Sequence, residues 1–309
     1  MTAGGGAALR HAMQAIALEA TCATADAQAI GAQAAGWAAS LALTYERRAH
    51  RTVMTGNAHA GPLVVQKSLY PEGDAVCHTV ILHPPGGIAG GDRLRIDVDA
   101  GPATHVLLTT PGATRWYKAN GREASQSTHL RAGSNAIFEW LPLETIVFDG
   151  AVAQSSLSVE VSDDARAAGW EVVAFGRRAA GETFANGRFR QSIEIRRDGS
   201  LLWAEHGEAE GGSALLSSPA GYAGHTVSGL FWACAGTLDA AALDACRERV
   251  RALPQPLLAG VTCLPGGVLL ARCLCDSTDQ ARRYLLQMWS VLRPLYAGRE
   301  ATLPRLWAT

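Results

Sequence analysis

Short runs in which hydrophobic and polar residues alternate recur over most of this 309-residue chain. In one such run, Leu94, Ile96 and Val98 are separated by single polar residues. A period of two places successive side chains on opposite faces of a β-strand. Short strands with turn signals roughly every 8 to 12 residues are typical of an all-β architecture. The pattern therefore predicts a mainly β fold.

Turn-forming residues divide these runs into expected strand pairs. Asp198-Gly199 stands between two strand-like runs and is a strong short-range hairpin signal. Gly101-Pro102 also stands between two such runs, and residues 265–267 form a Pro-Gly-Gly turn between two more. We predict a hairpin at each of these three turns.

Apolar residues at helical spacing are confined mainly to the last third of the chain. One helix is expected to begin after Asp239 as its N-cap and to end at Pro254. A second is expected to begin at Ser277 or Thr278 and to end at Pro294. The apolar stripe of the second helix comprises Tyr284, Leu285, Met288, Trp289 and Leu292.

The first 36 residues differ from the rest because they are rich in Ala and Gly and have no clear apolar stripe. We predict that residues 1–36 form a loosely ordered extension and that residues 37–309 form a single β domain. The extension lacks a basic segment followed by a continuous apolar core, so no secretory signal is expected.

Composition narrows the class of protein. Charged residues make up 18% of the chain and hydrophobic residues 48%, which is typical of a globular protein. The formal net charge of -1 gives no electrostatic signature of nucleic-acid binding. No run approaches the roughly 20 apolar residues that span a bilayer. Seven cysteines without a disulfide-framework spacing favour a reducing cytosol, so we expect a cytoplasmic protein with neither nucleic acid nor membrane as partner.

The glycine-rich segment HPPGGIAGGD, residues 83–92, is the first candidate site. It has neither a GK[ST] ending nor G-x-G-x-x-G spacing, and a strand rather than a helix is expected after it. Phosphate binding is therefore disfavoured, and the segment is interpreted as a shaped turn. His83 and Asp92 are either anchors of that turn or contacts for a divalent ion such as Ni²⁺, which nitrogen and oxygen ligands suit.

Cysteine and histidine spacings do not indicate a closed metal site. On a strand, Cys77 and His78 point to opposite faces and cannot chelate one ion together. Cys273 and Cys275 share a face, and burial as small apolar side chains is the favoured interpretation. No G-x-S-x-G segment is present, so covalent catalysis is not expected.

Three acids lie within the apolar segment of residues 138–151: Glu139, Glu144 and Asp149. Isolated carboxylates are not buried without partners, so each must reach solvent, a cation or backbone donors. Two interpretations stay open. These acids face outward from strands, or they line a water-filled passage that escorts a hydrated cation.

Five segments together resemble the UreD/UreH family of urease accessory proteins, and they occur in the family's order. They are HPPGGIAGGDRL (83–94), TTPGATRWY (109–117), EWLPLETIVFDGA (139–151), GWEVVAFGRRAAGETFANG (169–187) and PRLWAT (304–309). Two departures stand out. Arg115 replaces the usual Lys, and RCLCDS (272–277) replaces a common Leu-Gly pair.

The resemblance implies a fold of stacked β-sheets of β-helical type with two α-helices in the C-terminal third. It implies a non-enzymatic chaperone that binds UreF directly, UreG through UreF, and the urease apoprotein. No cofactor is expected to be tightly bound, and nickel would be in transit through an internal tunnel. The expected contacts for passing nickel are His83, Asp92, Glu139, Glu144, Asp149, Glu171 and Glu182.

Each of these seven residues has an ordinary alternative, which is to fix a turn or to pair with Arg93, Arg115, Arg177 or Arg178. Two other functions also stay open. A nickel-storage protein would bind the metal tightly without partners, and a carboxylate-dependent hydrolase would turn over a substrate alone.

Overall fold

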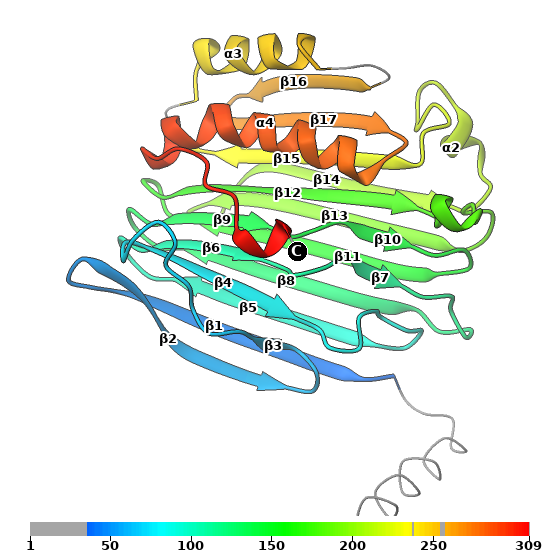
Figure 1. Cartoon of the computed structure of the whole chain (residues 1–309), viewed down its shortest axis with the longest axis horizontal. Coiled ribbons are helices and arrows are strands. Elements are labelled where there is room, and N and C mark those ends of the chain that lie inside the picture. Colours follow the sequence, from blue (N-terminus) through cyan, green and yellow to red (C-terminus); the bar gives the residue numbers. More distant parts are fainter. Residues whose placement is uncertain (1–35, 237, 254–256, 309) are drawn as a thin grey trace, which may run out of the picture. The chain divides into compact units, whose positions relative to one another are not determined.

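Two β-sheets face each other and two helices cover the outer side of one of them (Figure 1). The computed structural model describes residues 36–236, 238–253 and 257–308. Apart from Gly36, the expected N-terminal extension lies outside the described residues. The predicted mainly β fold of stacked sheets is confirmed.

The seven-stranded sheet contains, in spatial order, β14 (Ser200–Glu210), β13 (Arg188–Arg197), β11 (Val152–Val161), β8 (Ala124–Ala132), β5 (Arg93–Ala100), β1 (Ala38–Arg48) and β2 (Arg51–Ala60). The ten-stranded sheet contains β16 (Leu258–Leu264), β17 (Val268–Cys275), β15 (Val227–Cys234), β12 (Arg166–Phe175), β9 (Ile137–Leu141), β6 (His105–Thr109), β4 (Val76–Leu82) and β3 (Val64–Val65). Two further strands of the ten-stranded sheet, β10 (Thr145–Val147) and β7 (Thr114–Trp116), extend sideways from β12.

Most of the chain winds between the two sheets in successive coils. Strands β5, β8, β11 and β13 pair in parallel in the seven-stranded sheet. The strands that alternate with them, β6, β9 and β12, pair in parallel in the ten-stranded sheet. This winding is the expected β-helical arrangement, in which each coil contributes one strand to each layer.

The hairpin predicted at Gly101-Pro102 is wrong, because β5 and β6 belong to different sheets. The turn is instead a corner of the coil. Its backbone stacks on neighbouring coils, since the Gly101 amide donates to the Tyr45 carbonyl (2.9 Å) and the Gly133 amide to that of Ala100 (2.8 Å). A turn sequence specifies a change of direction, whereas the choice of sheet depends on these distant contacts.

The other two predicted hairpins are confirmed. Strands β13 and β14 pair in antiparallel fashion around Asp198-Gly199, where both residues have positive φ (46° and 77°). Strands β16 and β17 pair in the same way around the turn at residues 265–267. At both sites the turn joins two strands that are adjacent in sequence and pair with each other, so the local sequence is enough to predict the hairpin.

Two hydrophobic cores result from this layering. The first lies between the sheets and takes inward residues of both, including Leu41, Ile96 and Trp232. The second lies between the ten-stranded sheet and the C-terminal helices and includes Phe231 and Trp289. The inner strands of the ten-stranded sheet are therefore covered on both faces.

Helix α3 (Ala240–Arg251) begins as predicted, because the Asp239 carboxylate accepts the Ala242 amide at 3.0 Å. Its predicted end at Pro254 lies outside the described residues. Helix α4 (Thr278–Ala297) has the predicted apolar stripe buried, but it continues past Pro294. Proline lacks an N–H but keeps its carbonyl, which accepts the Gly298 amide at 3.0 Å where the helix ends. The remaining short helices are α2 (Ala214–Ser217), η2 (Arg178–Ala180) and η3 (Arg305–Ala308).

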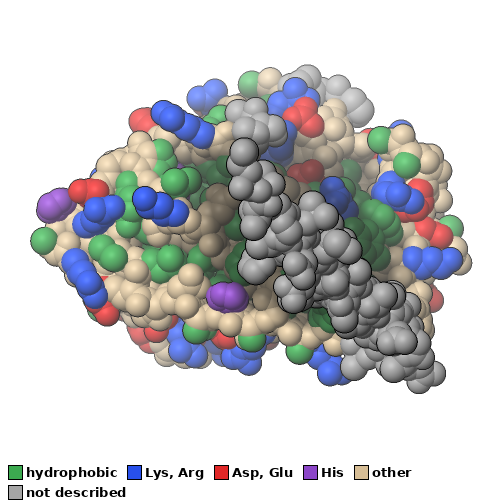
Figure 2. Space-filling view, turned by 60° about the horizontal axis from the view of Figure 1, so that its bottom comes forward, with side chains coloured by type: hydrophobic (Ala, Val, Ile, Leu, Met, Phe, Trp, Pro, Cys, Tyr) green, Lys and Arg blue, Asp and Glu red, His purple; other side chains and the backbone are tan. Residues whose placement is uncertain are grey.

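The face seen in Figure 2 carries mixed charges. Lys and Arg side chains alternate with Asp and Glu side chains around its margin, and hydrophobic side chains lie in a recess between them. No extended region of one sign is visible on the described part of this face. None of the described helices combines the length and apolar character needed to span a lipid bilayer.

Candidate functional site

Two cavities lie between the sheets. The edge cavity, of about 630 Å³, has the aromatic rings of Phe175, Phe189 and Tyr222 in its wall. The loop cavity, of about 220 Å³, is bordered by the glycine-rich turn and by His83. Glu171 is the only described residue that lines both cavities, so they meet at its side chain.

A row of polar side chains crosses the seven-stranded sheet between these cavities. Gln126, Ser155 and Gln191 are register partners on the adjacent strands β8, β11 and β13. Gln126 and Ser155 line the loop cavity, whereas Gln191 lines the edge cavity. Inward positions of a sheet that is covered on this face are normally apolar, so this row gives the space between the layers a polar lining.

Glu171 projects into this space from β12 in the opposite sheet. It is partly buried, and its Oε1 accepts a hydrogen bond from Trp140 Nε1 at 3.0 Å. Burial raises the pKa of Glu171 to about 7, and the Trp140 hydrogen bond offsets only part of this effect. The side chain is therefore divided between its neutral and charged forms near neutral pH.

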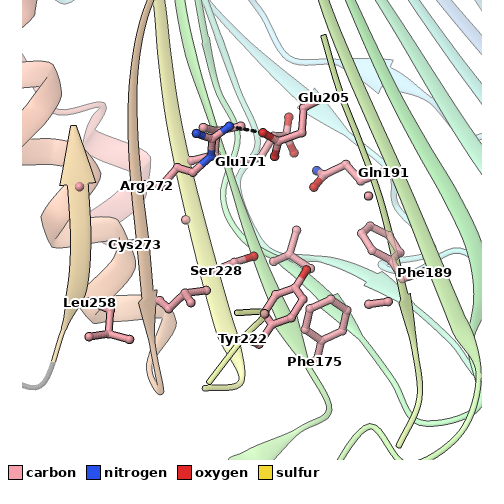
Figure 3. Close-up of a pocket in the computed structure, with 18 of the residues that line it drawn as sticks. Glu171, Phe175, Phe189, Gln191, Glu205, Tyr222, Ser228, Leu258, Arg272 and Cys273 are labelled. Atoms are coloured by element: carbon pink, nitrogen blue, oxygen red, sulfur yellow. Dashed lines mark hydrogen bonds and ion pairs between the residues drawn. The ribbon is translucent and has the colours of Figure 1, made fainter. Parts of the chain in front are cut away.

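An ion pair stands at the wall of the edge cavity. Arg272 on β17 and Glu205 on β14 reach toward each other from the two sheets (Figure 3). Both side chains are exposed, at 46% and 43% respectively. The Arg272 guanidinium also lies 6.0 Å from the centroid of the Trp203 ring.

His83 and Asp92, at the two ends of the glycine-rich turn, have different environments. His83 is partly buried in the wall of the loop cavity, where burial lowers its pKa and the charge of Asp92 opposes that shift. The Asp92 carboxylate accepts the amides of Trp37 and Ala89, each at 2.8 Å. Asp92 is thus an anchor of the turn, while His83 faces the cavity.

Glu139 lies on the opposite face of the ten-stranded sheet, beneath α4. It is fully buried and accepts hydrogen bonds from Tyr296 Oη (2.7 Å), Trp289 Nε1 (2.8 Å) and Arg293 Nε (3.0 Å), and it pairs with His105 (2.9 Å). Burial would raise the pKa of Glu139, but the His105 hydrogen bond and the Arg293 charge hold it well below its usual range. Its oxygens are therefore occupied by protein donors.

The same cluster includes a second buried carboxylate. Arg293 donates to both oxygens of Glu72, at 2.7 and 2.8 Å, and Glu72 pairs with His78 at 2.7 Å. Arg293 is fully buried, so these contacts fasten α4 to the ten-stranded sheet. Cys77, which points the other way as predicted, lies in the core between the sheets.

Asp149 and Glu182 meet in a loop corner outside both cavities. Asp149 accepts the amides of Ala185 (2.9 Å) and Asn186 (2.7 Å), and its own amide donates to Glu182 (3.2 Å). Glu182 also pairs with Arg177 at 2.6 Å. These contacts satisfy both carboxylates locally.

Glu144 lines neither cavity. Its carbonyl accepts the Thr114 amide at 2.9 Å, and within the described residues its side chain has no hydrogen bond or ion pair. Of the seven candidate residues, the structure therefore brings His83 and Glu171 to the connected cavities. The sequence analysis did not single out Gln126, Ser155, Gln191, Glu205 or Arg272, although each is a polar residue at an inward position of its strand.

No group of three or more His, Cys, Asp or Glu side chains within residues 36–236, 238–253 and 257–308 is arranged to hold a metal ion. Cys273 and Cys275 are buried in the core beneath α4, as expected for small apolar side chains. Where the two cavities meet, Glu171 is a single carboxylate among neutral polar groups, and the other carboxylate of the edge cavity, Glu205, is paired with Arg272.

Comparisons with known proteins point to one family. The profile of the family described as "UreD urease accessory protein" matches residues 38–308. A protein of Azoarcus sp. (strain BH72) named "Urease accessory protein UreD" is 47% identical over 287 residues, which cover 93% of this chain and 99% of the relative. Proteins of the same name from Dechloromonas aromatica (strain RCB) and Pseudomonas aeruginosa (strain PAO1) are 47% and 46% identical, each over 88% of this chain and 95% of the relative.

Proposed function

The chain belongs to the UreD family of urease accessory proteins, which gives it a role in urease maturation, and we propose that this role is to conduct nickel toward the apoenzyme. In this proposal the chain is a chaperone and not an enzyme. It binds UreF directly and UreG through UreF, and the assembly docks on the urease apoprotein. Nickel is the cargo, and GTP hydrolysis in UreG supplies the direction of transfer.

The observation that carries the proposal is the position of Glu171 where the edge and loop cavities meet. A cation that moves between the sheets must pass this carboxylate and the facing row of Gln126, Ser155 and Gln191. Such a path attracts a cation without holding it, because few charged ligands surround any one point. Weak contact favours release at the far end.

The test replaces Glu171 by Leu, which blocks the junction with an apolar side chain of similar volume. Glu171→Leu should lower nickel-dependent activation of urease at least roughly tenfold, because the only carboxylate at the junction is lost. Glu144→Leu is the matched control, since Glu144 is a nearby acid that lines neither cavity. Activation would be measured with UreF, UreG and apo-urease present.

Both variants should still coelute with UreF and with apo-urease, so that a loss of activation is not a loss of assembly. Normal activation by Glu171→Leu would contradict conduction past this residue. Calorimetry with nickel separates conduction from storage. Tight, stoichiometric binding by the isolated wild-type chain would contradict the conduit.

A further inference from the structure

The Arg272–Glu205 pair has a special place in the fold. Among the described residues it is the only ion pair that joins a strand of the seven-stranded sheet to a strand of the ten-stranded sheet. It lies in the wall of the edge cavity, with the guanidinium on one layer and the carboxylate on the other (Figure 3). Glu205 on the edge strand β14 and Arg272 on β17 lie nearer the edges of the two sheets than Glu171 on β12 does.

The charges behind the pair are unbalanced. Glu171 has one hydrogen bond, from Trp140, and no ion pair among the described residues. Leu230 stands between it and Arg272 in register, so the two backbones are two strand spacings apart, or about 10 Å. The wall of the edge cavity therefore carries one cation, Arg272, and two carboxylates, Glu205 and Glu171.

We propose that Arg272 is an exchangeable counter-cation that closes the edge cavity, and that an incoming nickel ion displaces it from Glu205. This inference rests on the proposed conduction of nickel. It adds that the Arg272–Glu205 pair admits divalent ions in preference to monovalent ones. Once Arg272 has moved aside, the divalent ion contacts Glu205 first and Glu171 next. Arg272 returns to Glu205 after the ion has passed.

The physical properties of the pair suit exchange. Both partners are nearly half exposed, and ion pairs of this kind are weak. A divalent ion attracts a carboxylate about twice as strongly as a guanidinium at the same distance. A monovalent ion has no such advantage over Arg272. The face of Trp203 gives the displaced guanidinium a second favourable contact close by.

The test compares two variants that remove the same ion pair but change the charge in opposite directions. Arg272→Gln leaves Glu205 uncompensated and should tighten nickel binding by the purified chain about fivefold. Glu205→Gln leaves Arg272 uncompensated and should weaken nickel binding by a similar factor. The double variant should return close to the wild-type affinity. Calorimetry with nickel chloride as the probe gives these affinities.

A matched control pair lies on the outer face of the same hairpin. Arg190 and Glu208 form an ion pair between β13 and β14, with exposures of 44% and 48%. Arg190→Gln and Glu208→Gln should leave nickel affinity unchanged, because this pair does not face the edge cavity.

If the ion pair only held the two sheets together, Arg272→Gln and Glu205→Gln would change the nickel affinity in the same direction. Affinities that shift in the same direction, or no detectable nickel binding by wild type and Arg272→Gln, would overturn the proposal. Failure of the proposed function has a different signature. Urease activation would then survive Glu171→Leu while the two affinities still moved in opposite directions.

Discussion

The titration of Glu171 follows from its surroundings, which combine burial with a single hydrogen-bond donor. Its pKa of about 7 lies above the ordinary value of 4.5. Between these two pH values the folded chain binds more protons at this residue than the unfolded chain does. The contribution of Glu171 to stability therefore falls as pH rises from about 4.5 to about 7 and is constant above that range.

Glu171→Gln should remove this dependence. We expect the variant to match the wild type at pH 5 and to exceed its free energy of unfolding by about 1 to 3 kcal/mol at pH 8, where the wild type carries the buried charge. Urea unfolding at both pH values measures the difference. An equal difference at pH 5 and pH 8 would show that Glu171 does not titrate in this range.

At this scale the sequence identifies the right kind of residue but not its environment. Glu139 and Glu171 each lie in an apolar strand, yet Glu139 faces α4 and is saturated by donors, while Glu171 faces the cavities. Which face a side chain occupies depends on the strand register, and a register shift of one residue would move every side chain to the opposite face. Arg293, the partner of Glu139, is 154 positions away and cannot be assigned from local sequence.

Helix α4 depends on one charged cluster as well as on its apolar stripe. Fully buried Arg293 is the only guanidinium bonded to both Glu72 and Glu139 within the described residues.

The apolar stripe of α4 was predictable, because helical spacing of large apolar residues is a local signal. The helix end was not, because the continuation past Pro294 depends on the packing of the last turn, where Tyr296 is buried.

Arg293→Met should destabilise the protein by about 3 to 5 kcal/mol, because it leaves two buried carboxylates without their main counter-ion. Arg283→Met is the control on the same helix. Arg283 is 66% exposed and pairs with Asp279 at 2.6 Å, so its loss should cost less than about 1 kcal/mol. Chemical denaturation of both variants measures these changes. Equal effects would show that the buried cluster does not hold the helix.

The described part of the molecule is a coiled stack of strands, and the pairing between coils is the feature that local sequence predicts least well. Turn residues mark the hairpins at Asp198-Gly199 and at residues 265–267, where the partner strand is adjacent in sequence. Gly101-Pro102 is also a local turn signal between two strand-like runs, but it makes a corner between layers. Only the family resemblance indicated the β-helical winding, because coil-to-coil pairing joins strands that are distant in sequence.

The described cores consist of apolar side chains and the Arg293 cluster, and within the described residues no group of three or more His, Cys, Asp or Glu side chains is arranged to hold a metal ion. Removal of metal by a chelator should therefore shift the melting temperature by less than about 1 °C, unlike in proteins folded around a structural ion. Scanning calorimetry with and without chelator measures the shift. A large decrease would reveal a structural metal.

The Arg293 cluster also has a consequence for biosynthesis. Arg293 follows Glu72 by 221 positions and Glu139 by 154, so the ribosome makes both carboxylates long before their shared counter-ion. Until α4 emerges, the two acids must remain hydrated, and the outer face of the ten-stranded sheet stays uncovered. This part of the fold therefore forms only after α4 has left the ribosome. A message truncated before α4 would yield a chain with an exposed apolar surface that chaperones and proteases recognise.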